Sequence, residues 1–431
     1  MQRVLLLLTI LFALYACTTT PPPPLGSVQP MPAPAQSGVI EVPLVNPNAP
    51  VVQAVEELPP LDMQTISLNP NAVAHIALLL PLKDPRFSEL AQAVRDGFMA
   101  AASMNPQGLP IRVYSDFDEN RSVVDTYRLA VSNGANAVVG PLTRNGVSAL
   151  AAEQMIPVPT LVLNTVDMHP AEQLYFFGLP ADDEARTVAQ LAAARGFHNA
   201  VVITNGTAMS QRLQLAFEEA WTKQGLTVAR EIDFRGDTTE FKKGFTIPNP
   251  AFASIPKDSK DPKDLAISEF LVVPDTMVFL ALDNKPARMV RPYLPGRMPI
   301  YATSQVFSDN EDTLTNYDLS GVRFVDMPWL LQPDHPAVIA FPHPNQPLPA
   351  MQERLYALGI DAYRLSQLML AHRLSSDLPL DGVIGQINLN GHTFQRTAVA
   401  GVFSQGRAVS TETVTATPAI QMFPDQFKST P

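Results

Sequence analysis

The sequence has 431 residues, with 30 Lys and Arg against 41 Asp and Glu, a formal net charge of -11 and a single cysteine. An acidic surplus without a basic block excludes a typical nucleic-acid-binding surface, because neutralising phosphates needs clustered Lys and Arg. A single cysteine excludes an intramolecular disulfide, a thiolate zinc site and a CxxC redox pair. The length allows two domains, each with its own core.

The N-terminus has the pattern of an export signal. Arg3 is followed by residues 4–16, which are apolar except for Thr9. This run is too short to span a bilayer, which takes about 20 apolar residues. A positive tip before a short apolar run is typical of a signal peptide that is removed on export. We therefore predict that residues 1–16 are a signal peptide.

Cys17 follows the apolar run directly, after Leu14-Tyr15-Ala16. This arrangement resembles a bacterial lipobox and predicts lipid attachment at Cys17, although Tyr15 replaces the small residue that is usual there. The alternative is an ordinary secretory signal with a chance cysteine. Thr18 is not acidic, which by the sorting rule for such lipoproteins favours the outer membrane, with the protein facing the periplasm. Several acyl chains together anchor a protein stably.

The segment after the cysteine has the composition of a disordered chain. Residues 18–73 contain 13 Pro in 56 positions, no aromatic residue and no Lys or Arg. Such a segment cannot bury enough apolar surface to offset the entropy cost of ordering. We predict a lipid-anchored, proline-rich stalk over residues 17–73, which serves either to reach a distant partner or only as a spacer.

From residue 74 onward, short apolar runs alternate with segments of helical periodicity. Strands are predicted at residues 76–80, 111–114, 137–140, 160–163, 200–204, 277–282 and 299–303. A helix follows the first strand, with Phe87, Val94 and Phe98 on one stripe, and another begins near Asn120 or Ser122. This alternation predicts an α/β fold with parallel sheets covered on both faces. The body is too long for one such sheet, so we predict two Rossmann-like lobes.

Several separated blocks resemble a known family. The opening resembles type I periplasmic binding proteins through residues 75–82 (HIALLLPL), 93–98 (AVRDGF) and 138–142 (VVGPL). Further blocks are residues 176–179 (FFGL), 301–304 (YATS), 321–324 (GVRF), 326–329 (DMPW) and 358–364 (LGIDAYR). Together they resemble the LppC-type penicillin-binding protein activator lipoproteins, over about residues 74–405.

The resemblance implies a type I periplasmic-binding-protein-like fold whose lobes are joined by hinge strands. It places lobe 1 at about 74–177 and 301–380, lobe 2 at about 178–300 and 381–405, and a C-terminal tail at 406–431. Better-known members carry an N-terminal helical-repeat domain, where this sequence has the stalk. The implied role is to bind a bifunctional, class A penicillin-binding protein and to stimulate peptidoglycan synthesis.

The sequence shows no convincing catalytic or metal-binding pattern. It has no GxSxG, SxxK, HExxH or phosphate-binding loop, and its seven histidines lack ligand spacing. Asp116, Asp118 and Glu119 form an acidic cluster after a strand, for which a solvated loop is the simpler interpretation. His335 and His343 lie in a proline-rich stretch typical of a surface loop. We predict no enzymatic activity, no metal and no cofactor.

A ligand-binding cleft is the more open question, because ligands of α/β sheets bind at the carboxyl ends of strands. Polar residues at three predicted strand ends make the candidate cleft: Thr143, Asn164, Thr165 and Ser304. The alternative is that Thr143 and Asn164 cap helices. The first loop, residues 81–85 (PLKDP), departs from the Pro-Leu-Ser-Gly of many amino-acid binders, and Lys83 and Asp84 could pair with each other.

Two further features admit both structural and functional interpretations. Residues 242–273 interrupt the second lobe with prolines and alternating charges, as a solvated or a binding loop does. Trp329 suits either core packing or an interface. Two functions therefore stay open: an activator of a cell-wall synthase, and a lipid-anchored receptor for an amino acid, amide or cell-wall fragment.

Overall fold

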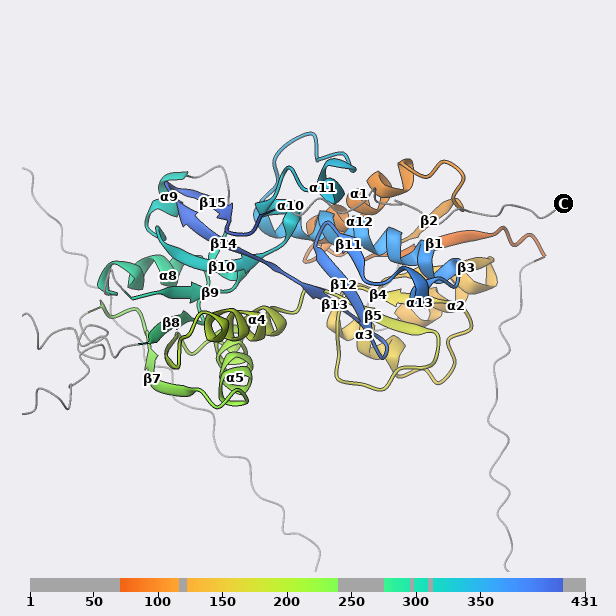
Figure 1. Cartoon of the computed structure of the whole chain (residues 1–431). Coiled ribbons are helices and arrows are strands. Elements are labelled where there is room, and N and C mark those ends of the chain that lie inside the picture. The colour runs from red at the N-terminus through yellow and green to blue at the C-terminus, as the bar shows by residue number, and fades with distance from the viewer. Residues whose placement is uncertain (1–69, 116–121, 239–274, 295–297, 309–312, 414–431) are drawn as a thin grey trace, which may run out of the picture. The chain divides into compact units, whose positions relative to one another are not determined.

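The computed structural model describes residues 70–115, 122–238, 275–294, 298–308 and 313–413. Within these residues the chain forms two sheets, one of eight strands and one of seven (Figure 1). The main parallel strands come from residues 75–177 in the first sheet and from residues 199–326 in the second, and strands from the C-terminal part of the chain lie at one edge of each. The predicted α/β fold class with two lobes is confirmed.

The first sheet has the strand order β11-β12-β13-β5-β4-β3-β1-β2. Its strands are β1 (His75–Leu79), β2 (Ile111–Tyr114), β3 (Ala135–Val139), β4 (Thr160–Val162), β5 (Leu174–Phe177), β11 (Leu380–Gly382), β12 (Gly385–Asn390) and β13 (Thr393–Thr397). Its helices are α1 (Ser88–Ser103), α2 (Val123–Ser132), α3 (Arg144–Ala151), α12 (Ala350–Leu370) and α13 (Leu374–Asp377). Alternate strand residues pack against α1 and α12 on one face and against α2 and α3 on the other.

The second sheet has the order β15-β14-β10-β9-β8-β6-β7. Its strands are β6 (Asn199–Thr204), β7 (Thr227–Asp233), β8 (Thr276–Leu280), β9 (Ile300–Ala302), β10 (Val322–Asp326), β14 (Val399–Ser404) and β15 (Arg407–Ser410). The long helices α4 (Ala181–Ala194) and α5 (Ala208–Thr222) cover one face. The other face packs against α8 (Asn284–Val290) and the 3-10 turn η3 (Ser304–Val306), and α9 (Thr313–Tyr317) lies near β14 and β15.

The seven strands that apolar runs predict are present, each within two residues of its expected bounds. The lobe boundaries need correction, because β9 and β10 belong to the second sheet and residues 380–397 belong to the first. The chain therefore crosses between the sheets after β5, near residue 177 as expected, and then after β10 and at Ala398, instead of near residues 300 and 380. An apolar run shows that a strand is buried, but it does not show which sheet the strand joins.

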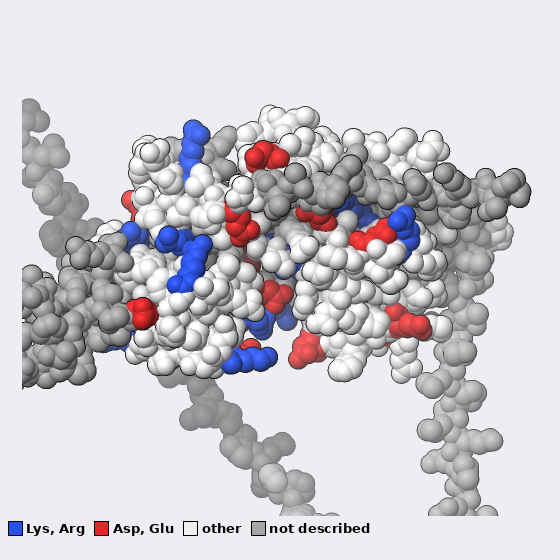
Figure 2. Space-filling view, viewed as in Figure 1, with Lys and Arg blue, Asp and Glu red and all other residues white. Residues whose placement is uncertain are grey.

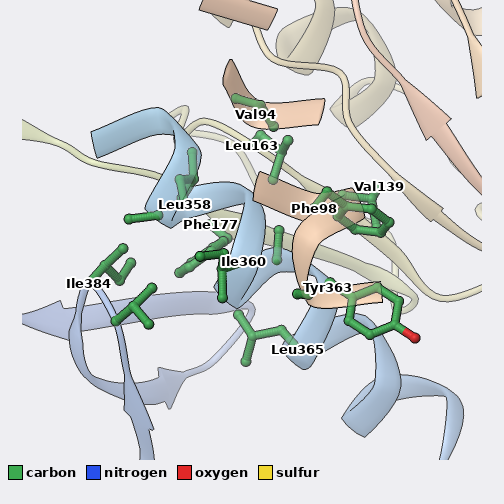
Figure 3. Close-up of a cluster of buried hydrophobic side chains, with 14 of the residues drawn as sticks. Val94, Phe98, Val139, Leu163, Phe177, Leu358, Ile360, Tyr363, Leu365 and Ile384 are labelled. Atoms are coloured by element: carbon green, nitrogen blue, oxygen red, sulfur yellow. The ribbon is translucent and has the colours of Figure 1, made fainter. Parts of the chain in front are cut away.

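The two main helices of the first lobe approach each other at glycine. A Cβ atom added to Gly97 of α1 would meet the carbonyl oxygen of Tyr356, and one added to Gly359 of α12 would meet that of Val94. Next to this contact, the rings of Phe98 and Tyr363 pack edge to face, with centroids 5.2 Å apart. Figure 3 shows the apolar side chains that the two helices and the sheet enclose. This close approach lets α12 lie buried along most of its length.

Two short helices, α10 (Pro328–Leu331) and α11 (Pro336–Ile339), lie between β10 and α12 in the sequence. Together with the proline-rich stretch they connect the second sheet to the first lobe. Trp329 is 4% exposed, and its ring stacks on His343 with centroids 4.1 Å apart. Its indole Nε1 donates a 2.8 Å hydrogen bond to Glu353. Core packing is therefore the correct interpretation of Trp329.

Several predictions concern parts of the chain outside the described residues. These are the signal peptide, Cys17 and most of the stalk, the acidic cluster at 116–119, the segment 242–273 and the part of the predicted tail from residue 414 onward. The predicted tail at 406–431 begins too early, because β15 at its start belongs to the second sheet. Among the described residues, no helix is long and apolar enough to cross a membrane.

Candidate functional site

A cavity of about 460 Å³ lies where β1, β3 and β4 end, at the carboxyl edge of the first sheet. This is the position at which α/β folds bind ligands. Its polar lining residues are Asp84, Arg86, Thr143, Arg144, Asn145 and Asn164. The remainder of the lining is apolar and includes Leu163 from the end of β4 and Leu355 and Leu358 from α12.

Two of the four predicted cleft residues line this cavity. The hydroxyl of Thr143 accepts a 3.2 Å hydrogen bond from the amide of Gly146 and thereby caps α3, as the alternative interpretation has it. Asn164 does not cap a helix. Its side-chain amide donates to the carbonyl oxygen of Leu142 at 3.1 Å, and its oxygen accepts from the amide of Thr165 at 2.9 Å. Asn164 thus ties the loops after β3 and β4 together.

The other two predicted residues lie elsewhere. Thr165 follows Asn164 but is not part of the cavity lining. Ser304 begins η3 after β9, in the second sheet, and is 1% exposed. Its position at a strand end was a correct prediction, but the strand belongs to the other lobe. The structure therefore brings Thr143 and Asn164 together and separates Ser304 from them.

In the loop after β1, the carboxylate of Asp84 is paired with the guanidinium of Arg86. Arg86 donates to the two carboxylate oxygens of Asp84 at 3.0 and 2.6 Å. These hydrogen bonds lower the pKa of Asp84 to about 2, so the carboxylate is charged and paired at neutral pH. Arg144, at the first position of α3, is exposed and forms no ion pair with any described residue. The cavity therefore has a mixed lining of apolar side chains, the paired Asp84 and Arg86, and the exposed guanidinium of Arg144 at its rim.

A second group of polar residues, entirely buried, joins the two lobes. Arg354 near the start of α12 binds both oxygens of Asp326 at the end of β10, with Nε at 3.1 Å from Oδ1 and Nη2 at 2.6 Å from Oδ2. The same Nη2 donates to the carbonyl oxygens of Ser304 and Phe307 at 3.0 and 3.1 Å. Arg354 is 4% exposed and Asp326 is fully buried. A helix of the first lobe is thereby bound to β10 and η3 of the second.

Glu184 of α4 provides the second ionic link between the lobes. Its carboxylate pairs with Arg396 of β13 in the first sheet and accepts a 2.9 Å hydrogen bond from the amide of Ser304. Burial raises the pKa of Glu184 and the charge of Asp326 adds to this effect, whereas Arg396 opposes it. Two carboxylates and two guanidiniums make up this network, so its formal charge is zero. We call Glu184, Asp326, Arg354 and Arg396 the interlobe network.

The network extends to a buried turn between β11 and β12. Val383 and Ile384 are fully buried, so their backbone polar groups need partners inside the protein. Asp361 accepts from the amide of Ile384 at 3.0 Å, and Arg396 donates to its carbonyl oxygen at 3.3 Å. The amide of Trp329 donates to the carbonyl oxygen of Val383 at 2.9 Å. Side chains from α12 and β13 thus satisfy an apolar turn inside the core.

Asp361 is itself neutralised within α12. Arg364, three residues later, donates to it at 2.8 Å, and both side chains are buried. Burial raises the pKa of Asp361, while Arg364 and the amides of the turn oppose the shift. Sequence patterns alone predict no role for these buried charges. The available signal is the presence of Asp361 and Arg364 among apolar residues in the run 358–365 of α12.

The described residues contain no group of three or more His, Cys, Asp or Glu side chains that could hold a metal ion. The candidate site is the cavity with Arg144 at its rim, and the interlobe network is buried between the lobes. Both arrangements bind or position groups, and neither combines a nucleophile with a base.

Comparison with known proteins places the chain in a family. The model of the LppC lipoprotein family matches residues 45–397. The chain belongs to the LppC family. The match covers both sheets up to β13, so it includes the cavity and the whole interlobe network.

Two named relatives share this family. The penicillin-binding protein activator LpoA of Photobacterium profundum is 26% identical over 373 residues, covering 82% of this chain and 59% of that protein. LpoA of Pectobacterium parmentieri is 23% identical over 445 residues, covering 83% of this chain and 64% of that protein. The LppC chain described here therefore spans about three fifths of the length of these relatives.

Two solved structures share the fold. The LpoA C-domain of Haemophilus influenzae, named as a regulator of PBP1A, aligns with a TM-score of 0.61 and 21% identity, over 78% of this chain and all of that one. A Chromobacterium violaceum protein, assigned by name to branched-chain amino acid ABC transport, aligns with a TM-score of 0.61 and 33% identity, over 77% of this chain and all of that one. The predicted periplasmic-binding-protein-like fold is confirmed.

The interlobe network allows a direct test. Changing Arg354 to Met leaves the carboxylate of Asp326 buried without its partner, which costs about 3–5 kcal/mol in comparable proteins. We expect a large fall in the urea midpoint of unfolding, followed by tryptophan fluorescence. Arg86→Met is the matched control, because it removes the same type of pair from an exposed site. Equal midpoints for the two variants would contradict the importance of the network.

Proposed function

We propose that this LppC protein binds a bifunctional, class A penicillin-binding protein and stimulates its synthesis of peptidoglycan. The observation that carries the proposal is the family match over residues 45–397, which takes in both lobes. Two relatives are named penicillin-binding protein activators, which supports the same function. The partner and the effect on it are inferred for this chain from those relatives.

A non-catalytic role fits what the site can do. The buried charged groups between the lobes neutralise one another, and the cavity combines apolar residues with the paired Asp84 and Arg86 and the exposed Arg144. Relatives are named as an activator and as a regulator, which are roles played through binding. We infer that the chain acts on its partner through surface contacts and not through a reaction of its own.

The proposal includes anchoring in the outer membrane through lipid on Cys17. It rests on the sequence before residue 18 and on family membership. A stalk over residues 17–73 would then connect the anchor to the two lobes, with the protein facing the periplasm. This arrangement would allow the lobes to contact an enzyme away from the outer membrane.

Stimulation of the synthase is the central prediction. We expect soluble protein that starts near residue 70 to increase glycan-strand synthesis from lipid II by the class A synthase of the same organism. The measurement compares the initial rate with and without the protein, and heat-unfolded protein is the control. If the rate stays the same and no complex forms, this activator function is wrong.

Lipid anchoring has its own test. Cys17→Ser removes the thiol that would be acylated, so we expect the full chain to lose palmitate labelling and to leave the membrane fraction. Thr18→Asp should retain the lipid but move the protein from the outer to the inner membrane on a density gradient, while Thr20→Asp serves as a control. Unchanged fractionation of Cys17→Ser would contradict the lipid anchor.

A solute receptor is the second candidate, favoured by the cavity and by the 33% identity to the Chromobacterium violaceum structure. If it is correct, a small apolar carboxylate such as leucine should raise the melting temperature, because ligand at 100 times its Kd stabilises a protein by about 2.7 kcal/mol. Arg144→Gln should abolish the shift, whereas Arg112→Gln on the exposed edge strand β2 should not. No shift with any amino acid or wall peptide would remove this candidate.

A further inference from the structure

Three arginines lie on one face of the second sheet, and none pairs with a carboxylate among the described residues. They are Arg195, which follows α4 directly, Arg323 of β10 and Arg407 of β15. Arg195 and Arg407 are exposed, and Arg323 is half-buried. We call these three side chains the arginine surface.

Strand register places them on the same face. Arg323 lies beside Tyr301 in the parallel pair β9–β10 and opposite Val402 in the antiparallel pair β10–β14. Val402 is in turn opposite Val409 of β15. Residues that are directly paired share a face, and so do residues two apart in one strand, which adds Arg407.

Tyr301 brings two of the guanidiniums together. Its ring is 3% exposed, and its hydroxyl accepts a 3.1 Å hydrogen bond from Arg195. The guanidinium carbons of Arg195 and Arg323 lie 6.0 and 5.9 Å from the centroid of this ring. The ring stabilises both cations, but their mutual repulsion is not relieved by a described carboxylate. A bound anion would relieve it.

Other arginines of the same lobe are already neutralised. Arg186, Arg212 and Arg288 pair with the carboxylates of Asp183, Asp182 and Asp318, at 2.7, 2.5 and 2.7 Å. Figure 2 shows scattered Lys and Arg side chains on the visible face of the lobe that carries β9 and β10, in a protein whose net charge is -11. The arginine surface is therefore a local exception to the acidic character of the chain.

The surroundings of these arginines favour a protein partner. Val409 is 39% exposed and Val402 is half-buried, and neither belongs to the core that packs under α4 and α5. Arginine next to exposed apolar side chains is typical of protein interfaces, where arginine is enriched and lysine is depleted. Membrane-binding patches usually combine about four to eight Lys and Arg, and this surface has three.

We propose that the arginine surface, with Val402 and Val409 between the charges, is where the chain binds an acidic patch of the synthase. This inference rests on the proposed function, because it assigns a face of the second lobe to that partner. Charge complementarity of this kind speeds association and selects the partner, and salt weakens it. The cavity of the first lobe plays no part in this contact.

The test uses the full lipoprotein in detergent and measures its Kd for the immobilised class A synthase. The triple variant R195Q/R323Q/R407Q removes the three charges, whereas R112Q/K223Q/K285Q removes three exposed charges elsewhere as the matched control. We expect the Kd to rise about tenfold for the first variant and to change less than twofold for the control. The dependence of the Kd on salt should also become weaker only in the first variant.

The possible results distinguish a wrong interface from a wrong activator function. Unchanged binding by a folded triple variant overturns the arginine surface and leaves the activator function standing. Failure of the wild-type protein to bind overturns the activator function, and this inference with it. If the triple variant misfolds by circular dichroism, Arg407→Gln alone, at an exposed site, should still weaken binding about twofold, and no effect overturns the proposal. If the triple variant loses binding to anionic phosphatidylglycerol vesicles but still binds the synthase like wild type, the assignment of this surface to a protein partner is wrong.

Discussion

Two buried carboxylates, Glu184 and Asp326, lie where the chain passes between its two sheets, and the fold depends on neutralising them. Taking one such ion out of water costs several kcal/mol unless a partner and hydrogen bonds replace the solvent. Arg354 and Arg396 provide that replacement, and both come from the first lobe, whereas both carboxylates come from elements of the second. The contact between the lobes is therefore ionic and directional. It specifies one set of partners more strictly than apolar packing alone does.

The helix α12 connects this network to the cavity. Arg354 lies on its first turns, beside Leu355 and one turn before Leu358, both of which line the cavity. Farther along, Asp361 holds the buried turn at Val383 and Ile384, which Arg396 also contacts. The glycine contact with α1 allows the helix to lie deep enough for all three roles. One buried helix therefore sets the position of the cavity wall, the interlobe network and the edge hairpin of the first sheet.

Local patterns in the sequence predicted the local structure and failed where distant residues meet. Apolar runs located seven strands, and polar residues after strands located the cap at Thr143. Ser304 was expected in the same cleft, but its strand belongs to the other sheet, which no periodicity reveals. The pair of Glu184 and Arg396 joins residues 212 positions apart. Buried charges in apolar segments indicate that partners exist, without indicating which residues they are.

The sites proposed for the two candidate functions lie on different lobes and differ in how their charges are paired. An amino-acid receptor needs a carboxylate for the ligand's ammonium group, but Asp84, the acid of the cavity, is held by Arg86. In the first lobe, Asp84 and Arg86 thus neutralise each other at the cavity, and Arg144 is the exposed cation at its rim. In the second lobe, Arg195 and Arg323 lack such partners among the described residues and lie over the ring of Tyr301, with Val402 beside Arg323. Complementary charge on two protein surfaces speeds their association and selects the partner. Among the described residues, the arginine surface of the second lobe carries such unpaired charge.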